Sequence, residues 1–256
     1  MKRMSMIAVM VLAAACGKPE RYVLVHGAFM GAWAWSGVKT GLEKQGATVS
    51  TVELPAHGAD PGTVGDATLD AYVARVGQAV DAAKGERVVL VGHSMGGMVI
   101  SQYAEKNAAK LDRLVYLAAY LPKDGEALTD LAYSDADSHL GPALEVDMMA
   151  GTGGIPDDKL QDIFCADCTE TAMNTIVSQY RDEPLRPLGE KVSLGTAFAG
   201  VPKRYVYTTQ DNAVSNALQR RMTDGVTLAG SATLDTSHSP FLSKVDDTVK
   251  ALSGTR

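Results

Sequence analysis

Ser94 stands in the sequence GHSMG at residues 92–96, directly after the apolar run 88–91 and before a second apolar segment. An apolar run without polar alternation is typical of a strand buried on both faces, as in a parallel sheet. Glycines two residues before and after a serine permit the tight strand-to-helix turn of a nucleophile elbow, which lifts the hydroxyl above the sheet. The pattern predicts a nucleophilic serine. The structural alternative is a glycine-rich turn whose serine only caps the helix.

A serine hydroxyl is a weak nucleophile near neutral pH and needs a base that removes its proton. Of the five histidines, His238 lies in a late loop after the last expected strand, from which it can fold back over the elbow. A histidine base needs a carboxylate that fixes its tautomer. Asp211 follows an expected strand at its carboxyl end, where open α/β sheets place functional groups. Asp124 and Asp235 compete for this role, but a turn-capping role suits Asp235 better, and the chain order that accompanies this elbow favours Asp211.

Strands and helices alternate along most of the chain. This alternation predicts an α/β fold in which a mostly parallel sheet of about six strands lies between two layers of helices. Strands are expected at 22–25, 47–54, 88–91, 114–119, 203–209 and within 225–234, and helices at 33–44, 69–83, 96–106, 215–222 and 245–252.

The alternation stops at about residues 126–194. Short helical stretches, a glycine-rich linker and two prolines there indicate a cap inserted between two core strands. Phe29, Met30, Met148 and Met149 are apolar candidates for a substrate pocket, and ordinary packing explains each of them equally well.

The N-terminus begins with basic residues, and the apolar run 6–15 leads through small residues to Cys16. This run is too short to cross a bilayer but suits an export signal. Residues 1–16 resemble a bacterial lipoprotein signal, in which Cys16 becomes the lipid-anchored first residue of the mature protein. Leu12 lies one position further from the cysteine than is usual, so a secretory signal cut near Ala15, giving a periplasmic or secreted protein, and an uncleaved cytosolic start remain open.

The other two cysteines form a C-x-x-C pair, Cys165 and Cys168. Such a pair can be a redox site or half of a zinc site. Zinc is disfavoured because no second C-x-x-C and no histidine pair accompany it. A local disulfide and two free thiols both remain open.

Composition limits the range of functions. Hydrophobic residues make up 46% of the 256 residues and charged residues 21%, which suits one large α/β domain over residues 21–256. The net charge of −6 and the lack of a basic cluster argue against a nucleic-acid partner. No metal or cofactor is expected, because acyl transfer on a serine needs neither.

Four segments together resemble the α/β-hydrolase superfamily from about residue 21 to the C-terminus: HG at 26–27, GHSMGG at 92–97, QD at 210–211 and SH at 237–238. More narrowly, HGAFMGAW at 26–33 resembles the group of plant methyl-ester esterases and hydroxynitrile lyases, which also contains bacterial esterases. The resemblance implies an α/β-hydrolase fold and a Ser94–His238–Asp211 triad. It further implies an oxyanion hole made by the backbone N–H groups of Ala28 and Met95.

The lyase branch of this group has a threonine at the position of Gly27 and a lysine at the position of Ser239. A cyanide leaving group needs a cation nearby, and Ser239 offers none. The predicted function is therefore hydrolysis of a carboxylic ester of a small apolar substrate through an acyl-enzyme. Acyl transfer, carbon–carbon cleavage or lyase chemistry on the same triad, and a ligand-binding protein that kept the fold, are the alternatives.

Overall fold

A six-stranded sheet forms the centre of the computed structural model, which describes residues 20–84 and 87–254. The strand order is β2-β1-β3-β4-β8-β9, and every neighbouring pair is parallel, which confirms the predicted sheet. The expected signal, Cys16 included, lies outside the described residues. The strands are β1 Arg21–Val25, β2 Thr48–Val52, β3 Val88–His93, β4 Leu111–Leu117, β8 Lys203–Thr208 and β9 Gly230–Leu234.

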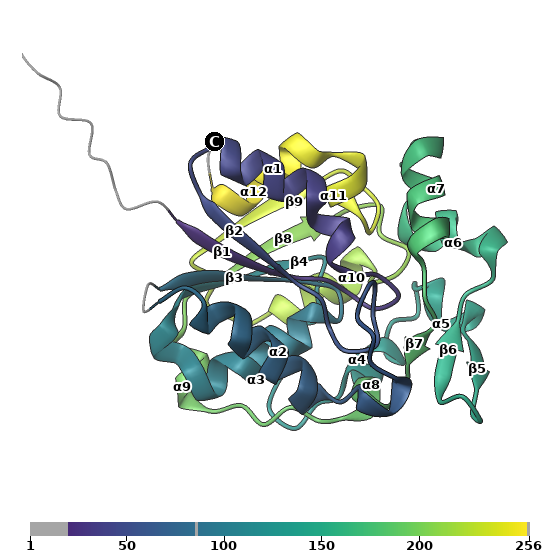
Figure 1. Cartoon of the computed structure of the whole chain (residues 1–256), viewed down its shortest axis with the longest axis horizontal. Coiled ribbons are helices and arrows are strands. Elements are labelled where there is room, and N and C mark those ends of the chain that lie inside the picture. The colour runs from purple at the N-terminus through teal and green to yellow at the C-terminus, as the bar shows by residue number, and fades with distance from the viewer. Residues whose placement is uncertain (1–19, 85–86, 255–256) are drawn as a thin grey trace, which may run out of the picture.

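Helices cover both faces of the sheet (Figure 1). One layer contains α1 Ser36–Lys44, α11 Pro240–Ser243 and α12 Val245–Ser253; the other contains α2 Leu69–Asp81, α3 Gly96–Asn107 and α10 Asn216–Thr223. Short 3-10 turns occur at η1 Ala32–Trp35, η2 Val64–Asp66 and η3 Ala108–Lys110, so the helix expected at 33–44 is divided between η1 and α1. The strand expected at 114–119 ends at Leu117, because Ala118 adopts a positive φ of 47° that turns the chain.

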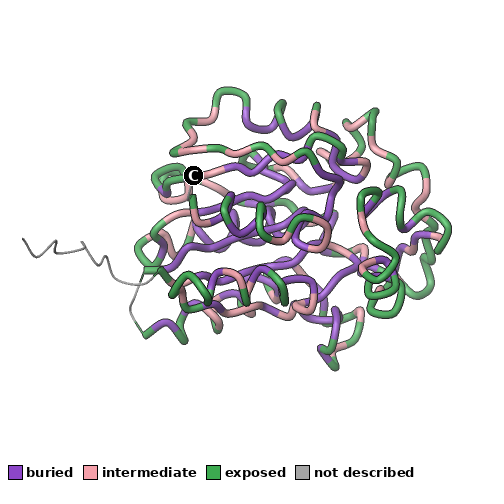
Figure 2. Tube along the Cα trace, turned by 90° about the horizontal axis from the view of Figure 1, so that it is seen from above, coloured by how far each residue is buried: buried purple, intermediate pink, exposed green. Residues whose placement is uncertain are grey.

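Alternate strand residues pack on opposite faces of the sheet. In β1, Val23 and Val25 join the core beside α2 and α3, whereas Tyr22 and Leu24 join the core beside α1 and α12. Figure 2 shows buried chain running through the centre of the molecule, with exposed segments around it. The two cores explain why the strand sequences are apolar without alternation.

Between β4 and β8 the chain leaves the sheet, and we call residues 126–194 the insertion. Much of it gathers at one end of the sheet (Figure 1). Its strands β5, β6 and β7 form a separate antiparallel sheet. The elements are α4 Leu128–Ala132, α5 Leu140–Ala143, β5 Glu145–Asp147, β6 Thr152–Gly154, α6 Asp157–Phe164, α7 Glu170–Gln179, β7 Glu183–Pro184 and α8 Arg186–Gly189, after which α9 Thr196–Gly200 returns towards β8.

Met148 and Met149 are 82% and 100% exposed, so ordinary core packing does not account for them; both line a pocket of about 660 Å³ whose lining does not include Ser94, Asp211 or His238. The two methionines lie in the turn between β5 and β6. Phe29 and Met30 are buried instead.

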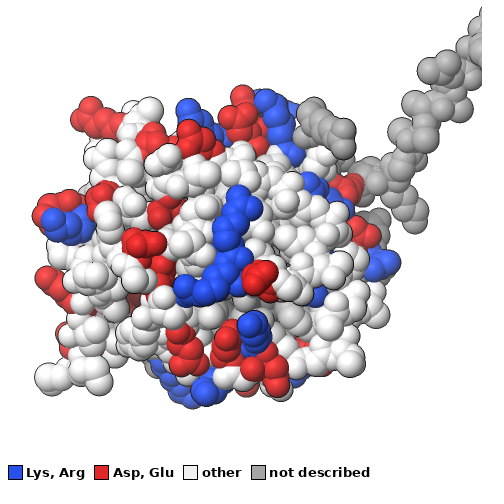
Figure 3. Space-filling model, turned by 180° about the vertical axis from the view of Figure 1, so that it is seen from behind, with Lys and Arg blue, Asp and Glu red and all other residues white. Residues whose placement is uncertain are grey.

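The outer surface carries both signs of charge. On the face in Figure 3, acidic and basic side chains are interspersed among neutral ones. Within residues 20–84 and 87–254, no helix combines the length and the apolarity that a membrane span requires.

Glycines allow the tight junction between β3 and α3. A Cβ added to Gly92 would lie 2.6 Å from the Gly96 carbonyl oxygen. A Cβ added to Gly96 would lie 2.9 Å from the carbonyl oxygens of Val25 and His26. A Cβ at Gly97 would lie 2.0 Å from the Tyr120 carbonyl oxygen. Because these neighbours are backbone atoms, they cannot swing away, and the junction requires glycine.

We expect Gly97→Ala to lower the free energy of unfolding by about 3 kcal/mol, through forced displacement of the packed backbone. Urea unfolding followed by tryptophan fluorescence measures this loss. Gly189→Ala is the matched control, because nothing lies within 4 Å of its added Cβ. Equal destabilisation by the two substitutions would contradict the packing argument.

Candidate active site

Ser94 occupies the turn between β3 and α3 in a conformation that side chains rarely adopt. Its φ is +52°, in the left-handed region. The backbone is fixed on both sides: Ser94 N–H donates to the Leu117 carbonyl (3.3 Å), and the Ser94 carbonyl accepts from the Tyr120 and Gly97 N–H groups (3.1 and 3.0 Å). These contacts hold the serine at the carboxyl edge of the sheet.

Asp211 and His238 lie in contact, as the sequence predicted. His238 Nδ1 is 2.8 Å from Asp211 Oδ2, and both residues are buried. Asp211 lies three residues after the end of β8, and His238 lies in the loop between β9 and α11. Because a carboxylate only accepts, Nδ1 carries a proton, and Nε2 is the ring nitrogen left to act as a base.

Four further donors fix the Asp211 carboxylate. Its Oδ1 accepts the N–H groups of Ala213 and Val214 at 2.9 and 2.8 Å. Its Oδ2 accepts the Thr208 hydroxyl at 2.8 Å and the Gln219 amide at 3.1 Å. A carboxylate that receives this many hydrogen bonds is held in one orientation.

His93 fixes the backbone of His238. Its Nε2 donates to the His238 carbonyl at 2.9 Å, and the two ring centroids are 4.5 Å apart. Burial, together with the nearby His238, holds the pKa of His93 well below its usual range, so this ring stays a neutral donor. A Cβ on Gly27 would lie 2.7 Å from Ser94 Cβ and 2.8 Å from His93 Nδ1, which excludes a side chain at position 27 without rearrangement.

His93 links the serine to the histidine. It precedes Ser94 in the sequence, and its side chain contacts His238. Among the described residues, no direct hydrogen bond joins the Ser94 hydroxyl to the His238 ring. Catalytic hydrogen bonds are often long in proteins without substrate and tighten in the reacting complex.

Two backbone donors beside the serine are free. Within residues 20–84 and 87–254, neither the Ala28 nor the Met95 N–H donates to a protein acceptor. Met95 precedes the first residue of α3, and Ala28 follows Gly27, whose position adjoins Ser94. Free N–H groups at a helix start attract negative charge.

The competing acids have other partners. Asp124 accepts the Leu194 N–H at 2.8 Å. Asp235 accepts hydrogen bonds from Thr209 and Gln210, which hold its pKa below the usual range. Neither carboxylate contacts His238.

The insertion packs against the loop between β9 and α11, which contains His238. The ring centroid of Phe164 lies 6.3 Å from that of His238. Cys165 and Cys168 form a disulfide at the end of α6, which decides the alternative that the sequence left open. Between them, Asp167 accepts the hydroxyl of Ser237, the residue before His238.

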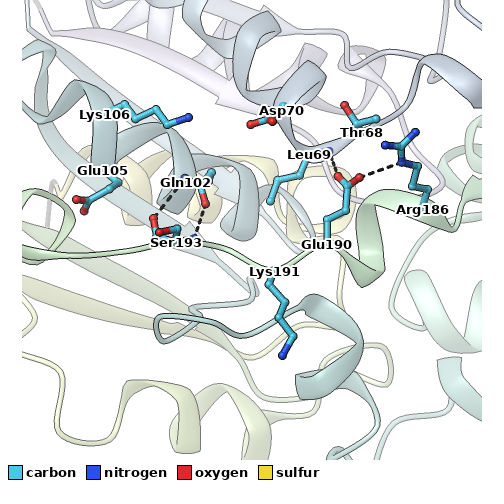
Figure 4. Close-up of a pocket in the computed structure, with 10 residues that line it drawn as sticks. All are labelled: Thr68, Leu69, Asp70, Gln102, Glu105, Lys106, Arg186, Glu190, Lys191 and Ser193. Atoms are coloured by element: carbon cyan, nitrogen blue, oxygen red, sulfur yellow. Dashed lines mark hydrogen bonds and ion pairs between the residues drawn. The ribbon is translucent and has the colours of Figure 1, made fainter.

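A separate pocket of about 630 Å³ lies between α2, α3 and the insertion (Figure 4). Polar and charged side chains dominate its lining, including Gln102, Glu105 and Glu190. It does not include the serine, the histidine or their aspartate. In the described part of the chain, no group of three or more His, Cys, Asp or Glu side chains is arranged to hold a metal ion.

Sequence reasoning missed His93, Thr208 and Gln219 as supports of the histidine and the aspartate. The adjacency of His93 to Ser94 was a usable signal, whereas nothing in the sequence connects Gln219 with a carboxylate eight residues earlier. It also missed a buried glutamate of the insertion, Glu183, which contacts the loop after β1.

Comparisons with known proteins identify the family and the fold. The sequence profile described as the alpha/beta hydrolase family matches residues 22–251. A protein of Arabidopsis thaliana provisionally named methylesterase 11, chloroplastic, is 28% identical over 251 residues, which cover 88% of this chain and 61% of that protein. The carbendazim hydrolyzing esterase of Nocardioides sp. (strain SG-4G) is 38% identical over 111 residues, 43% of this chain and 46% of that enzyme. The chain thus spans less than two thirds of the length of these two relatives.

Among solved structures, a polyneuridine aldehyde esterase variant matches with a TM-score of 0.82 at 21% identity, covering 93% of this chain and 99% of that one. At this identity the likeness establishes the fold alone. The relatives confirm the resemblance to the methyl-ester esterase group that residues 26–33 predicted.

Proposed function

The chain belongs to the alpha/beta hydrolase family, and from that premise we propose that it hydrolyses carboxylic esters through an ester formed on Ser94. His238 serves as the base and Asp211 as the carboxylate that orients it. The observation that carries the proposal is the buried 2.8 Å contact between His238 Nδ1 and Asp211 Oδ2, which leaves Nε2 as the ring nitrogen that can accept a proton. The ring of His93, the residue before Ser94, lies 4.5 Å from that of His238.

In the first half of the reaction, Ser94 Oγ attacks the ester carbonyl carbon while His238 Nε2 takes the hydroxyl proton. The tetrahedral intermediate then expels the alcohol, to which His238 returns that proton. In the second half, a water molecule gives its proton to His238 and attacks the acyl carbon. Ser94 leaves with the proton, and the carboxylic acid is released.

Negative charge develops on the former carbonyl oxygen in both halves. We assign its stabilisation to the N–H groups of Ala28 and Met95, which have no protein acceptor of their own. Loss of one such donor in an acyl-transfer enzyme costs about 10²–10³ in rate. Asp211 stays ionised throughout and stabilises the imidazolium that forms on His238.

We infer an apolar substrate from the surroundings of the site. The rings of Phe29 and Phe164 are buried 5.4 Å apart, and Phe164 lies 6.3 Å from the His238 ring, so the core beside the histidine is apolar, which supports an apolar acyl or alcohol group. Ser239, directly after the histidine, is fully buried, its hydroxyl has no partner among the described residues, and it offers no positive charge to a leaving cyanide. This favours hydrolysis over cleavage that releases cyanide.

A panel of p-nitrophenyl esters of increasing acyl length and methyl esters of aromatic and aliphatic acids tests the proposal. We expect saturable hydrolysis with a preference for apolar groups. If a folded wild-type protein hydrolyses no ester faster than the Ser94→Ala variant, the esterase assignment is wrong.

A further inference from the structure

Glu183 is a fully buried carboxylate that the proposed reaction does not use. It lies on β7, where its backbone pairs with Gly153 of β6. Its Oε2 accepts the Phe29 N–H at 2.7 Å and lies 2.8 Å from His57 Nε2, while its Oε1 has no partner among the described residues. Burial of a charged carboxylate lowers the stability of a protein unless an opposite charge compensates it. We therefore asked which group compensates Glu183 and what its carboxylate does.

His57 supplies the compensating charge. Its Nδ1 lies 2.9 Å from the Pro55 carbonyl, which can only accept, so Nδ1 carries a proton. Burial opposes charging of this ring, but the attraction and hydrogen bond of Glu183 outweigh it, and the pKa of His57 is raised. A proton on Nε2 as well gives an imidazolium that neutralises the carboxylate across the 2.8 Å contact.

Glu183 and His57 together hold Phe29, which lies in the loop after β1. Phe29 has a positive φ of 62°, which a non-glycine residue keeps only when its surroundings enforce it. Glu183 fixes its N–H, Arg181 N–H donates to its carbonyl at 3.4 Å, and Tyr180 stacks on its ring at 5.6 Å. Three neighbouring residues of the insertion therefore hold the backbone and the side chain of Phe29.

The peptide that joins Ala28 to Phe29 is the one that Glu183 orients. Rotation of this peptide changes the backbone conformation at Ala28. The direction in which the Ala28 N–H points therefore depends on the contact with Glu183. We propose that Glu183 is a positioning residue: through its contact with Phe29, it lets the insertion hold the Ala28 N–H in the direction that binds the oxyanion. This inference rests on the proposed function. His57 keeps the carboxylate from opposing the negative charge that develops close by.

Glu190 offers a matched control. It is also a carboxylate of the insertion that accepts a core N–H, that of Leu69 at 2.6 Å, and it pairs with Arg186 (Figure 4). It lines the separate pocket, away from the serine. Glu190→Ala therefore removes an anchoring contact of the insertion without touching the Phe29 loop.

The test compares Glu183→Ala, Glu183→Gln and Glu190→Ala. For Glu183→Ala we expect kcat per active site, titrated with a phosphonate, to fall about 10- to 100-fold, because small misplacements of catalytic groups are costly. We expect KM to stay within about threefold, since the oxyanion contact strengthens only in the transition state. Glu183→Gln keeps an acceptor for Phe29 N–H and should recover most of kcat, and Glu190→Ala should keep it.

Hydrogen exchange gives a readout that needs no activity. Glu183→Ala should speed amide exchange in a peptide covering residues 27–31, and Glu190→Ala should not. If Glu183→Ala leaves both kcat per active site and this exchange unchanged, the inference fails although the esterase assignment stands. If the wild type has no Ser94-dependent turnover, the esterase assignment fails, and the exchange experiment alone decides whether Glu183 holds the loop.

Discussion

Replacement of Ser94 by alanine is expected to lower kcat for ester hydrolysis by about 10⁶-fold, the scale on which serine hydrolases lose rate without their nucleophile. The alanine keeps Cβ and the backbone hydrogen bonds to Leu117 and Tyr120, so the fold should not change. Only the oxygen that forms the acyl bond is removed. Steady-state hydrolysis and thermal unfolding of the purified variant measure the two effects separately.

Ser101→Ala controls for the loss of a buried serine hydroxyl. Ser101 lies on α3, where its Oγ donates to the Gly97 carbonyl at 2.7 Å and lies 2.8 Å from the Tyr116 hydroxyl. We expect it to cost about 1–2 kcal/mol of stability with kcat per active site preserved. A similar collapse of kcat in both variants would show that the rate loss at position 94 is structural.

Asp211→Asn is expected to lower kcat by about 10⁴-fold, with far less effect on KM. Among the described residues, the five groups that hydrogen-bond this carboxylate are all donors, two at Oδ1 and three at Oδ2. An asparagine amide must turn its own N–H₂ towards one of these sets. If it faces His238, the imidazole loses the acceptor that keeps the proton on Nδ1, and Nε2 is no longer held as the base.

Asp235→Asn is the control for this substitution. Asp235 is exposed and hydrogen-bonds only Thr209 and Gln210 among the described residues, although it lies close to His238 in sequence. We expect kcat within about threefold of wild type, as for most surface changes. If Asp235→Asn loses rate and Asp211→Asn does not, the assignment of the acid is wrong.

The fold was predictable because its signals are local. Apolar runs such as 88–91 predict strands buried on two faces, and the alternation with amphipathic helices predicts a parallel sheet. Glycine spacing around Ser94 predicted the elbow, and the structure supplies the reason in the backbone contacts that a Cβ would meet. The contact between Asp211 and His238 followed from chain order, since parallel strands end at one edge of the sheet.

The insertion was not predictable in the same way. The side chain of Glu183 meets a residue that precedes it by 154 positions, and no local pattern records such a contact. Sequence likewise left packing and a pocket equally open for Met148 and Met149, and the structure exposes both in the turn between β5 and β6, at a pocket that does not include Ser94. The long-range contacts of an irregular segment depend on how that segment packs against the core. These contacts can therefore be seen only in the folded structure.

Covalent trapping tests the central claim most directly. The wild-type protein is treated with an alkyl fluorophosphonate, and the adduct is located by intact-mass and peptide analysis while ester turnover is followed. The account predicts one adduct per chain, on Ser94, formed in step with the loss of turnover. An adduct on another residue, or continued turnover by fully labelled protein, would contradict it.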